Sequence, residues 1–124
     1  MKTTKKHFEI FKKECQKWIK AFGMLGWRFY FDHEDLKRNW IACCYFPEEL
    51  EDRVFTLALN KKIPDSVTIE DVKRSAFHEV MEAFTHRICC LGVSRYIGPD
   101  EISEEKHNII RTLECVVFDR SKPC

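Results

Sequence analysis

The amino-acid sequence predicts a single α+β domain, with an N-terminal helix, a small and mainly antiparallel sheet of three strands, and two C-terminal helices. Three observations lead to this prediction. Apolar residues recur at steps of three and four in three long segments. Three short runs rich in aromatic and β-branched residues lie between the first and the second of these segments. The length of 124 residues suits one domain over residues 1–124, with a loose tail expected at 119–124.

The first helix is predicted from Thr4 to Phe22, where one apolar stripe runs along the segment and Gly23 follows it. The stripe consists of Phe8, Phe11, Cys15, Trp18 and Phe22. Lysines occupy much of the remaining helix surface, and we interpret them as a solvated face rather than a nucleic-acid patch. The net charge of +1 also argues against a general binder of polyanions, which would be clearly basic.

Strands are predicted at Trp27 to Phe31, Trp40 to Phe46 and Val54 to Leu59, because polar or turn-prone stretches separate these three runs. Their aromatic residues are expected to fill the core rather than to stack on bases, since no pattern typical of RNA-binding modules accompanies them. These residues are Trp27, Phe29, Phe31, Trp40 and Phe46.

The two C-terminal helices are delimited by capping and breaking residues. Thr68 is predicted to cap the second helix, with Asp71 three residues later. That helix should end near Cys90, before Gly92. After a break at residues 98–100, Ser103 should open a last helix that ends near Phe118.

Seven cysteines are present, an odd number, and no two have the C-x-x-C spacing of a zinc knuckle or a redox motif. This pattern predicts a reduced cytoplasmic protein whose thiols are mostly buried. The sequence shows neither a signal peptide nor a membrane span, so no membrane association is expected.

The second helix carries a compact polar face that could bind a cation. His78, Glu79, Glu82 and His86 lie within about 80° of one another around the helix axis. Residues four apart project from adjacent turns, so His78 and Glu82 could hold a metal ion with Glu79 beside it. Two alternatives remain: His86 could replace Glu82 as a ligand, or His78 and Glu82 could form a surface hydrogen-bonded pair.

The last helix carries a matching polar stripe of Glu104, His107, Arg111 and Glu114. Such a stripe is often only the solvated face of a helix. If the last two helices pack antiparallel, however, His107 can supply a third metal ligand to the site on the second helix. Glu105 is the alternative third ligand.

The segment His78-Glu79-Val80-Met81-Glu82 resembles the HExxH motif of zincin metallopeptidases, with Glu82 in the place of the second histidine. Residues 105–114 resemble the following helix of small zincin-like proteins of bacteriophages and prophages, and the element order resembles a minimal zincin fold. The resemblance implies a Zn²⁺ ion held by His78, Glu82 and His107. Two histidines and one carboxylate are a known ligand set of catalytic zinc sites. It also implies Glu79 as the general base.

Two function classes follow from this resemblance. The first is a zinc-dependent peptidase, in which an extended peptide adds to the edge strand nearest to the metal helix. We expect Val54, Thr56 and Ala58 to lie on that strand, and Tyr96 is a candidate oxyanion donor. The second class is a non-catalytic zinc protein of phage type that inhibits a host machine, such as a CRISPR defence nuclease. In both classes the partner is a protein or peptide, and nucleic-acid binding is not expected.

Overall fold

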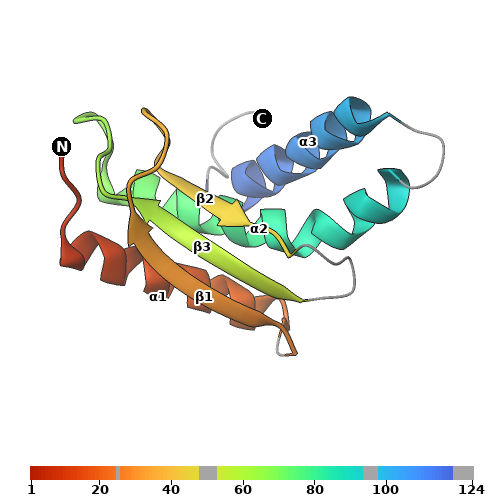
Figure 1. Ribbon diagram of the computed structural model, residues 1–124, viewed down its shortest axis with the longest axis horizontal. Coiled ribbons are helices and arrows are strands. Elements are labelled where there is room, and N and C mark those ends of the chain that lie inside the picture. Colours follow the sequence, from red (N-terminus) through yellow and green to blue (C-terminus); the bar gives the residue numbers. More distant parts are fainter. Residues whose placement is uncertain (25, 48–52, 94–97, 119–124) are drawn as a thin grey trace.

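The computed structural model describes residues 1–24, 26–47, 53–93 and 98–118, and its element order confirms the α+β class. Its helices and strands are α1 (Lys5–Ala21), β1 (Arg28–Glu34), β2 (Ala42–Tyr45), β3 (Val54–Asn60), α2 (Ile69–Val93) and α3 (Pro99–Phe118). Helices α1 and α2 pack against each other on one side of the sheet, and α3 packs along α2 near the β2 edge (Figure 1). The expected tail at 119–124 lies outside the described residues.

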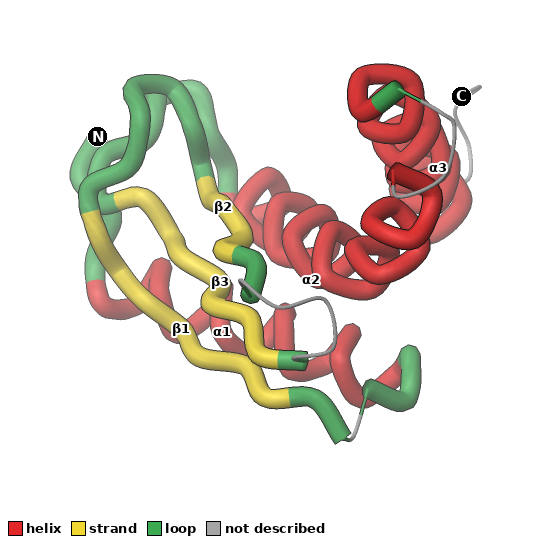
Figure 2. Tube along the Cα trace, turned by 45° about the vertical axis from the view of Figure 1, so that its right-hand side comes forward, coloured by secondary structure: helices red, strands yellow, loops and turns green. Residues whose placement is uncertain are grey.

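The three strands form a mixed sheet in the order β1-β3-β2. Strand β3 pairs antiparallel with β2 but parallel with β1, so the expected mainly antiparallel arrangement applies to only one of the two pairings. The reason is that residues 35–41 carry the chain from β1 past the position that β3 later takes between its two neighbours. Figure 2 shows the three strands side by side, with β3 in the middle.

The prediction that Val54, Thr56 and Ala58 lie on an edge strand is therefore wrong. They belong to β3, whose backbone is paired on both sides. A central strand is shielded on both flanks, and β3 is accordingly the most buried strand, with Leu57, Ala58 and Leu59 fully buried. Proximity to α2 in the sequence did not indicate the order of the strands in space. The edge strand beside α2 is β2.

The core lies between the sheet and helices α1 and α2, and the stripe predicted for the first helix contributes to it. Phe11 and Cys15 of α1 are fully buried, whereas Phe8, Trp18 and Phe22 pack against its margin. The largest buried side chains from the other elements are Leu57, Leu59, Val72, Phe77, Val80, Met81 and Ile110. No helix among the described residues is long and apolar enough to cross a membrane.

Two of the aromatic residues expected in the core are not there. Trp40 and Phe46 flank β2, the edge strand, and their side chains remain 46% and 40% exposed. Both line an open pocket between β2 and the two C-terminal helices. The other three, Trp27, Phe29 and Phe31, pack against the core as expected.

The helix boundaries follow local chemistry closely. Thr4 caps α1 and accepts a hydrogen bond from the His7 backbone, and Thr68 and Asp71 bond each other reciprocally at the start of α2. Helix α2 continues through Val93, beyond its expected end. Helix α3 begins at Pro99 rather than Ser103, because proline fits the first turn of a helix, where its missing N–H costs nothing.

The side chains of five of the seven cysteines are described, and all five are free thiols. Of these five only Cys15 is buried and the others are half-buried, so the prediction of mostly buried thiols is wrong for the described side chains. Burial raises the pKa of Cys15 well above its usual range and also raises that of Cys44, so these two thiols are packing groups rather than reactive ones. The side chain of Cys115 and the whole of Cys124 lie outside the described part of the chain.

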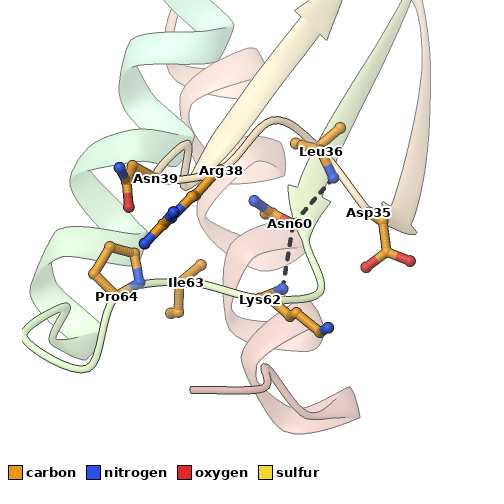
Figure 3. A pocket seen from close by; sticks show the side chains of 8 residues that line it. All are labelled: Asp35, Leu36, Arg38, Asn39, Asn60, Lys62, Ile63 and Pro64. Atoms are coloured by element: carbon orange, nitrogen blue, oxygen red, sulfur yellow. Dashed lines mark hydrogen bonds between the residues drawn. The ribbon is translucent and has the colours of Figure 1, made fainter.

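The loop between β1 and β2 is held by the side chain of Asn60, which is only 2% exposed (Figure 3). Its Oδ1 accepts hydrogen bonds from the backbone N–H groups of Leu36 and Lys62, at 3.0 and 3.2 Å. Its Nδ2 donates to the carbonyl oxygens of Lys37 and Trp40, at 3.2 and 2.8 Å. The amide thus uses its full hydrogen-bonding capacity to fix the loop that leads into β2.

We predict that Asn60→Ala lowers the free energy of unfolding by about 2–4 kcal/mol, because it leaves buried backbone groups of that loop without partners. Urea denaturation measures the change. The control is Thr56→Ala in the same strand, whose side chain makes no hydrogen bond within the described part of the chain and whose loss should cost less than about 1 kcal/mol. Equal losses for the two variants would contradict this role of Asn60.

Candidate metal centre

Three side chains from the two C-terminal helices converge at one point. His78 and Glu82 project from adjacent turns of α2, and His107 approaches from α3, so that one ligand atom from each lies within 4.8 Å of the other two. The Nε2 atoms of His78 and His107 lie 3.3 and 3.0 Å from the same oxygen, Oε1 of Glu82. Two nitrogens and one oxygen facing a common point form a candidate site for a divalent metal ion.

The antiparallel packing of α2 and α3 produces this convergence. Glu114, near the end of α3, lies beside Arg74 and His78 in the first half of α2. Lys106 and His107, earlier in α3, lie beside Glu82, one turn further along α2. Figures 1 and 2 show the two helices running side by side. The expectation that His107 would reach the polar face of α2 depended on this arrangement.

Both histidines are oriented through their second ring nitrogen. His78 Nδ1 lies 2.8 Å from Oε1 of Glu114, and His107 Nδ1 lies 2.8 Å from the carbonyl oxygen of Ser103. Because these oxygens can only accept, each Nδ1 carries the proton. The Nε2 atom then becomes the one that can bind a metal. Metal-binding histidines in proteins are usually held in this way.

Two further cations complete the cluster. Lys106 Nζ lies 2.7 Å from Oε2 of Glu82, and its side chain is only 11% exposed. Arg74 Nε lies 3.2 Å from Oε2 of Glu114. Glu114 is therefore shared between His78 and Arg74, and Glu82 between His78, His107 and Lys106. This charge balance means that the cluster is also satisfied when no metal is bound.

The ionisation of the cluster follows from these contacts. Burial alone would lower the pKa of His78, but its hydrogen bonds to Glu114 and Glu82 raise the pKa to about 10. Burial would raise the pKa of Glu82, but His78 and Lys106 lower it to about 2. Without a metal, His78 is thus a cation and Glu82 an anion at neutral pH, and a metal ion must displace the Nε2 proton.

Glu79 lies beside this cluster but makes none of its contacts. Its side chain is 8% exposed, and no hydrogen bond to it is found among the described residues. Burial raises its pKa to about 7, aided by the nearby Glu82 and opposed by His78. It borders an open pocket of about 480 Å³ that also contains the candidate ligands. The walls of this pocket are Trp40, Ala42, Cys43, Cys44, Phe46, His78, Glu79, Glu82, Lys106 and His107.

The sequence also offered His86 and Glu105 as alternative ligands and Tyr96 as an oxyanion donor. His86 is not part of the converging group in the described region. Its ring stacks on Phe46 at 4.3 Å between centroids, and Nε2 lies 3.4 Å from the Cys90 sulfur. The side chain of Glu105 and all of Tyr96 lie outside the described residues.

Three participants in the cluster were not assigned from the sequence: Glu114, Arg74 and Lys106. Glu114 was listed in the polar stripe of the last helix without a role, and its position seven residues after His107, two turns away, was the available signal. Lys106 gave no signal, because a lysine next to a candidate ligand is normally solvated. Only the packing of α3 on α2 buries it.

In protein freed of metal by a chelator, Glu79→Gln should raise the free energy of unfolding at about pH 8 by roughly 2–3 kcal/mol. The folded state raises this pKa from 4.5 to about 7, so the contribution of Glu79 to stability is most favourable below pH 4.5 and is lost as pH rises through about 7. Glutamine mimics the uncharged form and avoids this loss. Near pH 5 the two proteins should differ little.

Urea denaturation at the two pH values measures this difference. The control, Glu104→Gln, removes an exposed carboxylate and should give the same result at both. If Glu79→Gln stabilised the protein equally at both pH values, the raised pKa of Glu79 would not be the cause of the stabilisation.

Comparison of the chain with protein-family models, with curated protein sequences and with solved structures finds no match. The geometry of the site and its chemistry therefore carry the functional argument.

Proposed function

We propose that this protein binds Zn²⁺ through His78, Glu82 and His107 and acts as a zinc-dependent peptidase. The observation that carries the proposal is the convergence of two Nε2 atoms and one carboxylate oxygen, with each histidine held at Nδ1 by an acceptor. Two histidines and one carboxylate form a ligand set used by zinc hydrolases, and nitrogen with oxygen donors suits zinc better than magnesium or calcium.

When bound in such a site, zinc acidifies a water molecule and polarises a carbonyl group. In this proposal, Glu79 takes the proton from the attacking water and passes it to the leaving amine. Its place in the pocket wall, next to the ligands and not hydrogen-bonded by them, supports this role. Lys106 supplies a positive charge at the same pocket and would stabilise the developing oxyanion.

The free edge of β2 supports a peptide substrate. This strand lies at the end of the sheet and packs on α2, so an extended peptide could pair with its open edge and pass over the pocket. Trp40 and Phe46, which flank β2, would contact the side chains of that peptide. Strand β2 thus takes the role that the sequence had suggested for β3.

Zinc binding itself is tested by metal content. Wild-type protein incubated with zinc and then dialysed should retain about one ion per chain, whereas His78→Ala and His107→Ala should retain none. Glu114→Gln should weaken zinc binding about 10- to 100-fold, because it loosens the orientation of His78. His7→Ala is the control, since His7 caps α1 and should leave zinc binding unchanged.

The zinc affinity should also rise with pH, by about tenfold per pH unit between roughly pH 6 and 8, because His78 must lose a proton. Competition with a chelator measures the affinity. Stoichiometric zinc in His78→Ala, or an affinity that does not change with pH, would contradict this ligand assignment.

Catalysis is tested with Glu79→Gln. Zinc-loaded wild type should cleave peptides in a complex digest, read as new termini by mass spectrometry. Glu79→Gln should lower the cleavage rate by about 10²- to 10⁴-fold while zinc content stays unchanged. Glu104→Gln, on an exposed position of α3, should cleave as the wild type does. Absence of cleavage by the zinc-loaded wild type, or equal cleavage by Glu79→Gln, would overturn the proposal that this protein is a peptidase.

The ion pair between Lys106 and Glu82 favours a second candidate, a binding protein without catalysis. This pair engages Oε2 of Glu82, the oxygen that does not face the two Nε2 atoms, and it balances charge in the cluster, so the site is stable without activating a water. The resemblance to phage proteins extends this candidate to inhibition of a host defence nuclease. A biological activity that survives Glu79→Gln would favour it. We also propose a cytoplasmic location, which the five free thiols support.

A further inference from the structure

The end of the sheet at which β1 and β3 finish gathers basic side chains. Residues 1–3 run alongside 61–63, with Thr3 N donating to Lys61 O at 2.8 Å and Ile63 N donating to Met1 O at 2.9 Å. This pairing includes a bridge that places Lys2 directly opposite Lys62. The adjoining first turn of α1 adds Lys5 and Lys6.

Two adjoining hollows open at this end. One, of about 440 Å³, has Arg38 and Lys62 in its wall, together with Asn39 and Pro64 (Figure 3). The other, of about 340 Å³, is lined by Lys2, Lys61, Lys62 and His33. Asp35 is shared by both hollows and is the one acidic side chain among their described lining residues. Figure 3 shows Arg38 and Asp35 on opposite sides of the first hollow.

These cations have no partners of opposite charge among the described residues. No carboxylate of the described chain forms an ion pair with Lys2, Lys61 or Lys62, and the same holds for Arg38 and for the lysines of the first turn of α1. Like charges opposite each other in a β-bridge are destabilising. Lysines in the first turn also oppose the helix dipole, and that turn contains no acidic residue. The arrangement lowers stability, and an anionic ligand would offset this cost.

An exposed aromatic residue lies on the same loop as Arg38 and Asn39 of the first hollow. Trp40 is 46% exposed, and its backbone carbonyl accepts a hydrogen bond from Nδ2 of Asn60, which also lines that hollow, at 2.8 Å. Its ring lines the pocket beside α2, and Lys37 Nζ lies 5.1 Å from the centre of the ring. The loop thus carries a flat surface for stacking next to a positive charge.

We propose that this surface, formed by Lys2, Lys61, Lys62, Arg38 and Trp40, binds single-stranded nucleic acid. The cations of the two hollows contact successive phosphates, and the ring of Trp40 stacks on a base. Two adjacent basic hollows fit a repeating phosphate backbone better than a single free phosphate. The exposed indole distinguishes the ligand from an acidic peptide, which offers charge but no base to stack. The net charge of +1 argues against general polyanion binding, and the proposal is confined to this one surface, where the cations are concentrated.

The test is fluorescence anisotropy with a labelled oligothymidylate of about 15 nucleotides, in chelator, between about 50 and 200 mM salt. Wild type should bind, with an affinity that falls linearly on a log–log salt plot. Lys61→Gln/Lys62→Gln should reduce the magnitude of that slope by about 1.4, roughly 0.7 for each phosphate contact. Trp40→Ala should weaken binding about 5- to 150-fold, and Trp40→Phe should retain most of the affinity.

The matched control is Lys13→Gln/Lys20→Gln, which removes the same charge from exposed positions further along α1. It should leave the salt slope unchanged. A control that weakens binding as much as Lys61→Gln/Lys62→Gln would overturn the proposal, since binding would then reflect only total charge. Unchanged binding by Trp40→Ala, or equal competition by a polyglutamate of matched charge, would also overturn it. Because the chelator removes metal, none of these outcomes depends on the proposed zinc site.

Discussion

The carboxylate of Glu82 is the interaction on which the rest of the candidate site depends. It receives Nε2 of His78 from its own helix, and Nε2 of His107 and the ammonium of Lys106 from α3. One largely buried anion thus joins two helices that meet through a polar as well as an apolar surface. Burying an ionised carboxylate is unfavourable unless cations or hydrogen bonds compensate it, and here Lys106, His78 and His107 all contact it. These contacts hold α3 against α2 together with the apolar packing of Ile110 in the core.

The same contacts create a competition between protons and metal. Without metal, His78 bridges Glu82 and Glu114 as an imidazolium, and the cluster is electrostatically complete. A divalent ion placed among the same atoms would take over the role of the imidazolium proton, while Glu114 would keep His78 in its orientation. The cluster can therefore exist with a proton or with a metal ion at Nε2 of His78. The ion pair between Lys106 and Glu82 would be present in both forms, and a metal site made of ligands alone has no such ion pair.

The sheet separates two surfaces of different character. Beside α2, the edge strand β2 and its flanking aromatic residues border the carboxylate and histidine cluster. At the other side of the loop held by Asn60, the prevailing side chains are lysines and Arg38, which form no ion pair with the described carboxylates. Trp40 lies between the two, since it lines the first surface and adjoins the second. The hydrogen bonds of Asn60 to this loop couple the geometry of both surfaces to the end of β3.

Sequence alone determined the elements and the chemistry on each helix face, because helical spacing and capping depend on near neighbours. The α+β class, the cap at Thr68, the face with His78, Glu79 and Glu82, and the stripe with His107 were all readable. Strand order, the burial of Lys106 and the exposure of Trp40 were not. These depend on which segments meet across long sequence separations: residues 35–41 leave room for β3 between its neighbours, and α3 folds back on α2. Tertiary structure alone decided them, because pairing and packing are properties of two segments and not of either one.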